Sequence, residues 1–596
     1  MSILSERLAV RIPDRDARVE TTVDVTAPRE GMSYVRGPTT PPLAYITIPQ
    51  LLRNAVSRFG PREAAVFPEQ GIRMTYYDLD RAVDELASGL LALGLGKGDR
   101  VGIWSPNRFE WVLTQFATAR VGLVLVNINP AYRLGELEYA LNKVGCKALI
   151  AAKSFKSSDY SGMIRTLAPE LEDCEPGQLR AAKLPQLRSV IVMDDQPGPG
   201  AYSFDMLQQL GGPAQQLRLP EVDKTLGPDD AINIQFTSGT TGMPKGATLS
   251  HYNIVNNARY VTDRMGLSET DRLAIPVPLY HCFGMVMGVL GAVSKGATMI
   301  FPGEGFDAAQ TLDALSKERC TALYGVPTMF VAMLENLEGN PRDLSNMRTG
   351  IMAGAPCPVE VMQRVNTDMN MNMKEVTICY GMTETSPVSF QSFVDDPTDK
   401  RCETVGRVHP HLEVKIIDQD GRIAPVGTQG ELCTRGYSVM KGYWDDTQKT
   451  VESIMDGWIH TGDLAVFDET GFCSIVGRVK DMIIRGGENI YPREIEEYLM
   501  RHPKVSDVQV FGIPDEKFGE EVCAWAIAKP GVDLTEDELR NALKGQIAHF
   551  KVPRHIRIVE ELPMTITGKP QKFVMRDKMV EMSKVCGCCQ RELQRR

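Results

Sequence analysis

The sequence lacks an excess of basic side chains, and it lacks any long hydrophobic run. Its 596 residues include 66 lysines and arginines against 76 aspartates and glutamates, which gives a net charge of −10. A protein that coats nucleic acid needs a basic surface, so nucleic acid is not an expected partner. The most apolar stretch, residues 282–293, is about a dozen residues long, short of the roughly 20 that span a membrane. We therefore expect no transmembrane segment.

Cysteines with disulfide or zinc-type spacing are missing as well. The 13 cysteines are scattered and odd in number, which favours reduced thiols in an intracellular protein over a disulfide framework. Three of them, Cys586, Cys588 and Cys589, lie in a polar tail. A solvated tail is the main interpretation there, and a soft-metal or lipidated site is the alternative.

Clear targeting signals are also scarce. The N-terminus has no apolar signal core. Its first 20 residues hold four arginines but also four acids, whereas mitochondrial transit peptides are poor in acids. The last three residues, Gln-Arg-Arg, are not the usual peroxisomal signal.

What remains is the composition of an ordinary globular protein, with 43% hydrophobic and 24% charged residues, which excludes disorder and collagen. The length fits about four domains of roughly 150 residues, or equally one large α/β body and a smaller domain. Helical spacing alternates with short apolar runs along the first half, which favours largely parallel sheets. The helix is marked by Leu79, Val83, Leu86, Leu90 and Leu93, and the strands are expected at 101–104, 121–126, 190–193 and 232–236.

After about residue 405 the pattern changes. Closely spaced turn signals separate short strands, such as 412–417 and 431–434, which indicates a β-rich subdomain. Past Gly477 a compact α+β pattern follows, with an amphipathic helix over 493–500. Strands are expected there at 505–511 and 522–528. We place a domain boundary near residues 478–481.

The strongest motif is a loop rich in glycine and hydroxyl groups at residues 237–246, between strand 232–236 and a strand-like run at 247–250. Its glycines let backbone N–H groups approach an anion, its hydroxyls add donors, and Lys245 adds a positive charge. These are the parts of a polyphosphate-binding loop. It is not a Walker A loop, because no Ser or Thr follows the lysine and the loop joins two strands. The alternative is a plain surface turn.

This loop resembles the phosphate-binding loop of the adenylate-forming (AMP-binding) enzymes, which include acyl-CoA synthetases, luciferases and peptide-synthetase adenylation domains. The family's other motifs follow in order over roughly residues 45–580: a nucleotide and metal segment at 380–385, a ribose segment at 458–463, a hinge at 477–481 followed by 485–492, and a catalytic-lysine loop at 565–569. Within the family, residues 279–284 and the stretch around 482–492 are most similar to medium-chain fatty acyl-CoA synthetases.

The resemblance implies an α/β protein with a large N-terminal α/β domain of parallel-type sheets, a β-rich subdomain and a small mobile α+β C-terminal domain. Residues 1–45 are a loosely ordered lead-in, 46–477 the large AMP-binding domain, 478–481 the hinge, and 482–596 the small domain with the catalytic-lysine loop. It also implies an intracellular protein and suggests the mitochondrial matrix, with cytoplasm and peroxisome left open. The oligomeric state is left open too.

The implied reaction is ATP-dependent ligation of a fatty acid, of medium chain length by resemblance, to CoA, with release of AMP and pyrophosphate. ATP, CoA and Mg²⁺ are the implied co-substrates and metal. One alternative is adenylation of another acid, short and branched or hydroxylated, or delivery to a carrier protein. Another is a non-catalytic nucleotide-binding protein, which is disfavoured because Lys245, Glu384, Asp463 and Lys569 are all present.

The resemblance also implies roles residue by residue. The catalytic residues are Lys569, which bridges carboxylate and α-phosphate oxygens, Thr383, the Mg²⁺ ligand Glu384, and His281 at the acyl tunnel. The hinge residue is Lys480. The CoA-binding residues are Gly486 and Gly487. The ATP-binding residues are Thr237, Ser238, Gly239, Thr240, Thr241, Gly242, Met243, Pro244, Lys245, Gly354, Ala355, Pro356, Tyr380, Thr383, Asp463, Arg478 and Lys569.

Several of these residues keep a structural alternative. His281 could be a hydrogen-bonded core histidine, and the paired glycines at 486–487 could simply form a hairpin turn. Residues 354–356 could be a plain turn, and 383–384 a capping pair. Phe283, Met285, Val286 and Met287 could line an acyl tunnel or belong to a buried core helix.

Overall fold

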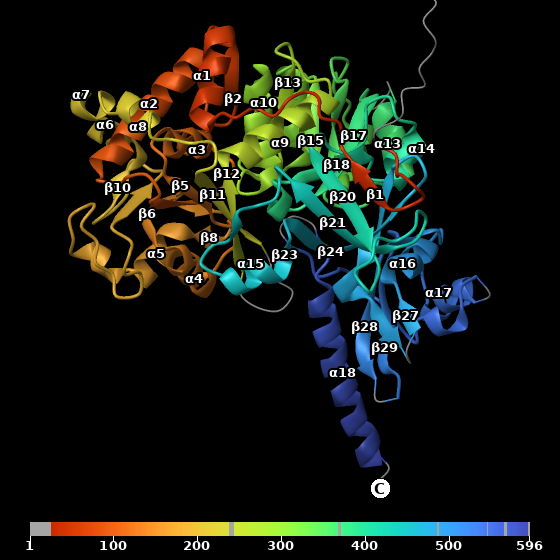
Figure 1. Cartoon of the computed structure of the whole chain (residues 1–596). Coiled ribbons are helices and arrows are strands. Elements are labelled where there is room, and N and C mark those ends of the chain that lie inside the picture. Colours follow the sequence, from red (N-terminus) through yellow and green to blue (C-terminus); the bar gives the residue numbers. More distant parts are fainter. Residues whose placement is uncertain are drawn as a thin grey trace, which may run out of the picture.

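The computed structural model describes residues 26–237, 244–367, 371–485, 488–515, 517–544, 546–565 and 569–593. Two large sheets form the N-terminal body (Figure 1). The first has eight strands, parallel from β10 to β11 and antiparallel at β12 and β22. In spatial order its strands are β10 (Tyr202–Ser203), β9 (Ser189–Val192), β6 (Cys146–Ala151), β4 (Arg100–Trp104), β5 (Val124–Asn127), β11 (Ala231–Thr237), β12 (Lys245–Ser250) and β22 (Gly442–Tyr443).

The second sheet has nine strands, parallel from β17 to β2 and antiparallel at its edges. In spatial order they are β19 (Arg407–Val408), β18 (Val388–Gln391), β17 (Glu375–Gly381), β16 (Thr349–Ala353), β15 (Ala322–Gly325), β13 (Arg272–Ala274), β14 (Thr298–Ile300), β2 (Glu63–Phe67) and β3 (Ile72–Thr75). The main helices of the body are α1 (Ile48–Phe59), α2 (Tyr76–Ala92), α3 (Phe109–Arg120), α4 (Leu134–Val144), α9 (His251–Arg264), α11 (Ala308–Lys317), α12 (Pro327–Gly339) and α13 (Val359–Asn366).

Helix α2 shows why the periodicity was informative. Thr75 caps its first turn, since Thr75 Oγ1 accepts from the Asp78 N–H while Asp78 Oδ2 accepts from the Thr75 N–H. Leu79, Val83 and Leu86 are buried along one face, as their spacing predicts. The expected parallel α/β architecture is confirmed.

Two local expectations were wrong. The strand expected over 121–126 begins only at Val124, because Gly122 adopts a left-handed turn conformation with φ +71° after α3. In the lead-in, Tyr34–Arg36 form strand β1, which pairs antiparallel with β20 (Leu412–Ile417). This part of the lead-in is therefore built into a sheet.

The β-rich subdomain is an antiparallel sheet of six strands. It contains β1, β20, β21 (Gly430–Gly436), β24 (Trp458–Phe467), β23 (Ile454–Met455) and β25 (Cys473–Arg478). Short helix α15 (Thr447–Ser453) lies between β22 and β23 in the chain.

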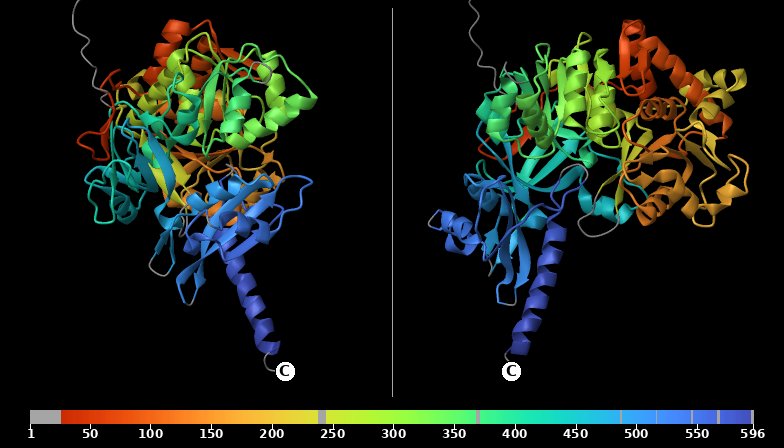
Figure 2. Two further views of the ribbon diagram at one scale, coloured as in Figure 1. Left: turned by 90° about the vertical axis from the view of Figure 1, so that its right-hand side faces the viewer. Right: turned by 180° about the vertical axis from the view of Figure 1, so that it is seen from behind.

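The C-terminal unit follows the one-turn helix at Val479–Asp481. Its sheet contains β26 (Ile483–Arg485), β27 (Glu488–Ile490), β28 (Val505–Asp515), β29 (Gly519–Ala528) and β30 (His555–Ile558), with α16 (Pro492–Met500), α17 (Glu536–Leu543) and α18 (Lys572–Leu593). Both apolar clusters of this unit consist of residues from Ile483 onward, so it has a core of its own. Helix α18 projects away from the rest of the molecule (Figures 1 and 2). Within the described ranges, every helix is too short or too polar to cross a bilayer.

Candidate active site

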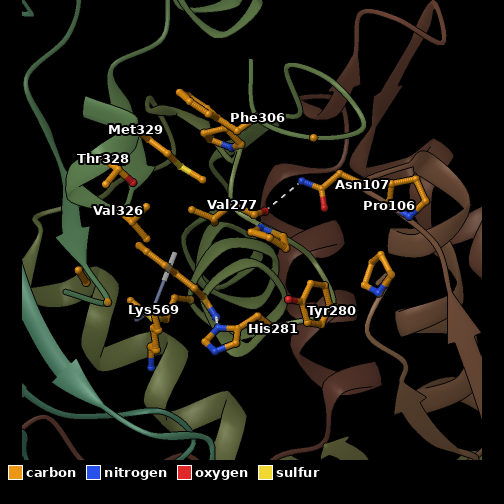
Figure 3. A pocket seen from close by; sticks show the side chains of 18 of the residues that line it. Pro106, Asn107, Val277, Tyr280, His281, Phe306, Val326, Thr328, Met329 and Lys569 are labelled. Atoms are coloured by element: carbon orange, nitrogen blue, oxygen red, sulfur yellow. Dashed lines mark hydrogen bonds between the residues drawn. The ribbon is translucent and has the colours of Figure 1, made fainter. Parts of the chain in front are cut away.

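A cavity of about 440 Å³ lies between the N-terminal body and the lysine loop of the C-terminal unit. Figure 3 shows His281 and Lys569 at one end of it and Phe306 and Met329 toward the other. The lining is mostly apolar, as in ligand pockets generally, with a few polar groups such as Asn107, His281 and Thr328. Its principal residues are Asn107, Val277, Tyr280, His281, Phe283, Met287, Phe306, Val326, Met329, Gly354, Gly381 and Lys569.

Lys569 lines this cavity, and two hydrogen bonds join its backbone to Thr565. Its N–H donates to Thr565 Oγ1 at 2.9 Å, and the Thr565 N–H donates to the Lys569 carbonyl at 2.8 Å. The side chain is open to solvent inside the cavity, yet protein atoms crowd around it, and this desolvation lowers the pKa of Lys569. The positive charge of Arg478 lowers the pKa further, while Asp463 and Glu384 oppose the change. These influences place the lysine among groups from three other motifs.

Glu384 is a buried carboxylate at the start of the turn after β17. Tyr443 Oη donates to Glu384 Oε1 at 2.8 Å, and Thr237 Oγ1 donates to the same oxygen at 3.3 Å. Lys245 Nζ donates to Tyr443 Oη at 3.1 Å and lies 4.2 Å from the centre of the tyrosine ring. Burial lowers the pKa of Lys245, and the charge of Glu384 opposes this. The geometry therefore joins the phosphate loop to the metal segment through Tyr443.

Tyr443 could not be predicted from the sequence as part of this site. It reaches the site because β22 adds to the edge of the first sheet, with Tyr443 opposite Ala247 of β12. Strand pairing across almost 200 residues leaves no local signal, and only the glycine beside the aromatic residue hints at a special position.

Asp463 lies on β24 directly opposite Arg478 at the end of β25. Arg478 Nε donates to Asp463 Oδ1 at 2.8 Å, and Tyr380 Oη donates to Asp463 Oδ2 at 2.5 Å. Burial and the Asp463 charge raise the pKa of Tyr380. Arg478, the first residue of the expected hinge, is also the last residue of β25, so it lies in the same sheet as Asp463.

His281 lines the cavity and keeps a hydrogen bond within its own turn. Its Nδ1 accepts from the Phe283 N–H at 3.2 Å, which leaves Nε2 to carry the proton of the neutral ring. Burial, aided by the charge of Lys569, lowers the pKa of His281 to about 4. The ring is therefore a neutral polar group at neutral pH.

The expected tunnel segment folds as a single π-helix, Phe283–Leu290. Phe283 and Met287 line the cavity, whereas Met285 turns into the first sheet, where its sulfur accepts from Asn127 and Gln235. Val277, Phe306 and Met329, which sequence reasoning did not identify, supply much of the apolar wall. They come from three separate loops and helices, so no spacing rule connects them.

The remaining predicted residues are placed as follows. Gly354 lines the cavity in a left-handed conformation with φ +92°, and Ala355 and Pro356 follow on an exposed turn. Thr383 is buried beside Glu384, and Pro244 accepts a hydrogen bond from Tyr139. Lys480 is exposed, and its charge contributes to the lowered pKa of Lys245. Outside the described residues lie Ser238, Gly239, Thr240, Thr241, Gly242, Met243, Gly486 and Gly487.

Two family models match the chain. The model described as AMP-binding enzyme matches residues 52–444, and that described as AMP-binding enzyme C-terminal domain matches residues 494–569. Among curated proteins, the medium-chain acyl-CoA ligase ACSF2, mitochondrial, of Danio rerio is 49% identical over 92% of this chain and 90% of its own length. The putative acyl-CoA synthetase YngI of Bacillus subtilis is 48% identical over 91% of this chain and 98% of its own length.

Solved structures show the same likeness. ATP-bound MatB from Rhodopseudomonas palustris is 28% identical with a TM-score of 0.75, over 89% of this chain and 99% of its own. A fatty acyl CoA synthetase of Mycobacterium tuberculosis is 27% identical with a TM-score of 0.69, over 89% of this chain and 98% of its own.

Proposed function

Because this chain belongs to the AMP-binding enzyme family, we propose that it joins a medium-chain fatty acid to CoA through an acyl-adenylate, with release of AMP and pyrophosphate. It is an ATP-dependent acyl-CoA synthetase. The observation that carries the finer proposal is the meeting of Lys569 and His281 at one end of an apolar cavity. A carboxylate held there would have its alkyl chain among apolar side chains and its charge beside the lysine.

The test is pyrophosphate release with octanoate and ATP, measured with and without CoA. Release in both arms, with a thioester only when CoA is present, supports the proposal. Release without any thioester would point to delivery of the acyl group elsewhere, and no release would point to a non-catalytic nucleotide-binding protein.

We propose that Lys569 stabilises the charge that develops as the carboxylate attacks the α-phosphate. Two anions must approach one another, and a fixed cation in a partly desolvated site favours that transition state. Lys245, which is held by Tyr443, binds the phosphates. Asp463 binds the ribose hydroxyls and is positioned by Tyr380 and Arg478. Residues 238–243 of the loop lie outside the described residues, and we assign them to the phosphates by family likeness alone.

Glu384 fits a magnesium ion. Its carboxylate is a hard oxygen ligand. Among the described residues, the hydroxyls of Thr237 and Tyr443 both donate to Oε1, which leaves Oε2 for a cation. Mg²⁺ bound there would supply positive charge to phosphate oxygens. We propose that Thr383, which is buried beside it, donates a hydrogen bond to phosphate.

Tyr443 gives a test of this arrangement. Replacing Tyr443 with phenylalanine removes the donor to the Glu384 carboxylate, and we expect the apparent KM for MgATP to rise about tenfold. The KM for octanoate stays within about twofold. The matched control is Tyr202→Phe. The Tyr202 hydroxyl donates to the Pro176 carbonyl, and both residues lie far from Tyr443 in the sequence. Equal effects of the two variants would contradict the role of Tyr443.

The pH dependence of adenylation follows from the lowered pKa of Lys569. Since the ammonium form is the active one, the rate should fall as pH rises through the pKa, and this fall should begin below the ordinary lysine value of about 10.4. His281 titrates at about 4, so it adds no change of rate between pH 6 and 8. We would measure pyrophosphate release from pH 6 to 11, with His281→Asn as the comparison. A basic limb at or above the ordinary value would contradict the prediction.

Acyl chain length gives a test of the apolar end. Met329→Trp should shorten the space beyond Val277, so kcat/KM for decanoate falls relative to butyrate. Each methylene that loses its contacts costs about 0.8 kcal/mol, or about fourfold in selectivity. The control is Met206→Trp, since Met206 is exposed on α6 (Phe204–Leu210). An unchanged chain-length profile would show that the acyl chain lies elsewhere.

We propose that the two units are the domains expected from the sequence, with the hinge expected at residues 478–481 between them. The separate cores on either side support this. Gly486 and Gly487 remain the proposed CoA contact. We also propose an intracellular enzyme, located in the mitochondrial matrix where the host has one, because the vertebrate ACSF2 relatives are named as mitochondrial proteins.

A further inference from the structure

Three metal-binding side chains meet on one face of the β-rich subdomain, outside the cavity. Cys433 of β21 lies opposite His460 of β24, and Glu431 is two residues before Cys433 on the same strand. Residues two apart share a face of a sheet, and a register shift between Glu431 and Cys433 brings the carboxylate toward the imidazole. The three ligand atoms lie within 4.8 Å of one another.

The distances suit a tetrahedral ion. His460 Nδ1 lies 2.9 Å from Glu431 Oε2 and 3.6 Å from Cys433 Sγ. Bonds of about 2.0–2.3 Å to zinc imply neighbouring ligand atoms roughly 3.3–3.8 Å apart, so a small opening of the Glu–His contact would admit the ion. One sulfur, one nitrogen and one oxygen favour a thiophilic divalent cation over Mg²⁺ or Ca²⁺.

We propose that Glu431, Cys433 and His460 bind one Zn²⁺ ion, with water as the fourth ligand. The Glu431 and His460 side chains retain 25% and 18% of their exposure, so an ion can enter from solvent although Cys433 is buried.

The site is joined to the ribose segment by the backbone. The Gly462 N–H donates to Glu431 Oε1 at 3.1 Å, and Gly462 immediately precedes Asp463. Thr461 Oγ1 donates to the Leu432 carbonyl at 2.8 Å and accepts from the Asp463 N–H at 3.1 Å. A cation that draws Glu431 toward itself competes with the Gly462 hydrogen bond. Zinc therefore weakens ATP binding, an effect that rests on the proposed function, whereas zinc binding itself does not.

Co²⁺ titration of the full chain tests the site. We expect one Co²⁺ per chain with a thiolate-to-cobalt charge-transfer band, displaced by Zn²⁺ and lost in Cys433→Ser. The control is the triple variant Cys586→Ser, Cys588→Ser, Cys589→Ser, which should keep the band. Absence of the band, or its persistence in Cys433→Ser, would overturn the proposal. A far-ultraviolet circular dichroism spectrum and thermal midpoint confirm that the variants fold, and Cys433→Ala serves if the serine does not.

The coupling has its own measurement. With one equivalent of Zn²⁺ bound to the chain, Mg²⁺ in excess and ATP varied across its KM, we expect the KM for ATP to rise severalfold in the parent and not in Cys433→Ser. An unchanged KM in zinc-loaded parent enzyme would overturn the coupling. If neither protein releases pyrophosphate at all, the proposed function fails, while the Co²⁺ band still decides the metal site.

Discussion

Replacing Lys569 with methionine should reduce acyl-adenylate formation by at least 100-fold, on the scale seen when one transition-state donor is removed. Methionine keeps the length of the side chain and removes the charge that faces Glu384, Asp463 and the cavity. The attacking carboxylate and the phosphate would then approach without a cation between them. The measurement is pyrophosphate release with octanoate at saturating ATP.

The same variant should spare the second step. When synthetic octanoyl-AMP and CoA are supplied, thioester formation should stay within a few-fold of the parent rate. Lys572→Met is the matched control, because Lys572 is also on the C-terminal unit but pairs with Glu496 at 2.7 Å. Parental adenylation by Lys569→Met would refute the proposed role of the lysine.

Replacing Lys480 with proline should give the opposite pattern. Residues 479–481 form a single short turn between two separately packed cores, and such a position can absorb a large backbone change. Proline fixes φ near −65°, which is compatible with the turn seen here but not with a second arrangement that needs another φ. Adenylation should stay within a few-fold, and thioester formation from octanoyl-AMP should fall at least 100-fold.

Lys480→Ala distinguishes the effect of restricting the backbone from the effect of removing the charge of Lys480. Alanine removes the positive charge that acts on Lys245 but keeps the backbone free, so both half-reactions should continue. Loss of both steps in Lys480→Pro would show damage to the adenylation arrangement. Equal loss of the thioester step in both variants would assign the effect to charge.

The sequence allowed a prediction of residues whose role lies within a short motif. Lys245, Glu384, Asp463 and Lys569 each stand in a segment whose residue types already suit phosphate, metal or ribose, and the structure brings all four together. The parallel sheets were also predictable, because buried strands are apolar throughout.

Residues that depend on distant pairing could not be predicted in this way. Tyr443 enters the site through an added edge strand, and Met329 faces the cavity from the start of α12. Met285 shows the reverse case: its place in an apolar run suggested a tunnel wall, but its sulfur accepts hydrogen bonds from buried amides. Which face of a helix is buried is decided by the packing of other segments.

Tyr443 contacts Lys245 in two ways, through a hydrogen bond to the tyrosine hydroxyl and through the face of the tyrosine ring. These contacts affect the entropy of nucleotide binding. A free lysine side chain loses about 1.5–2 kcal/mol of rotamer entropy when it is immobilised. Here contacts within the protein already hold the lysine. Calorimetry should therefore show a smaller unfavourable entropy of ATP binding for the parent than for Tyr443→Ala. In that variant the Lys245 side chain would lose its rotamer entropy only when the phosphates bind.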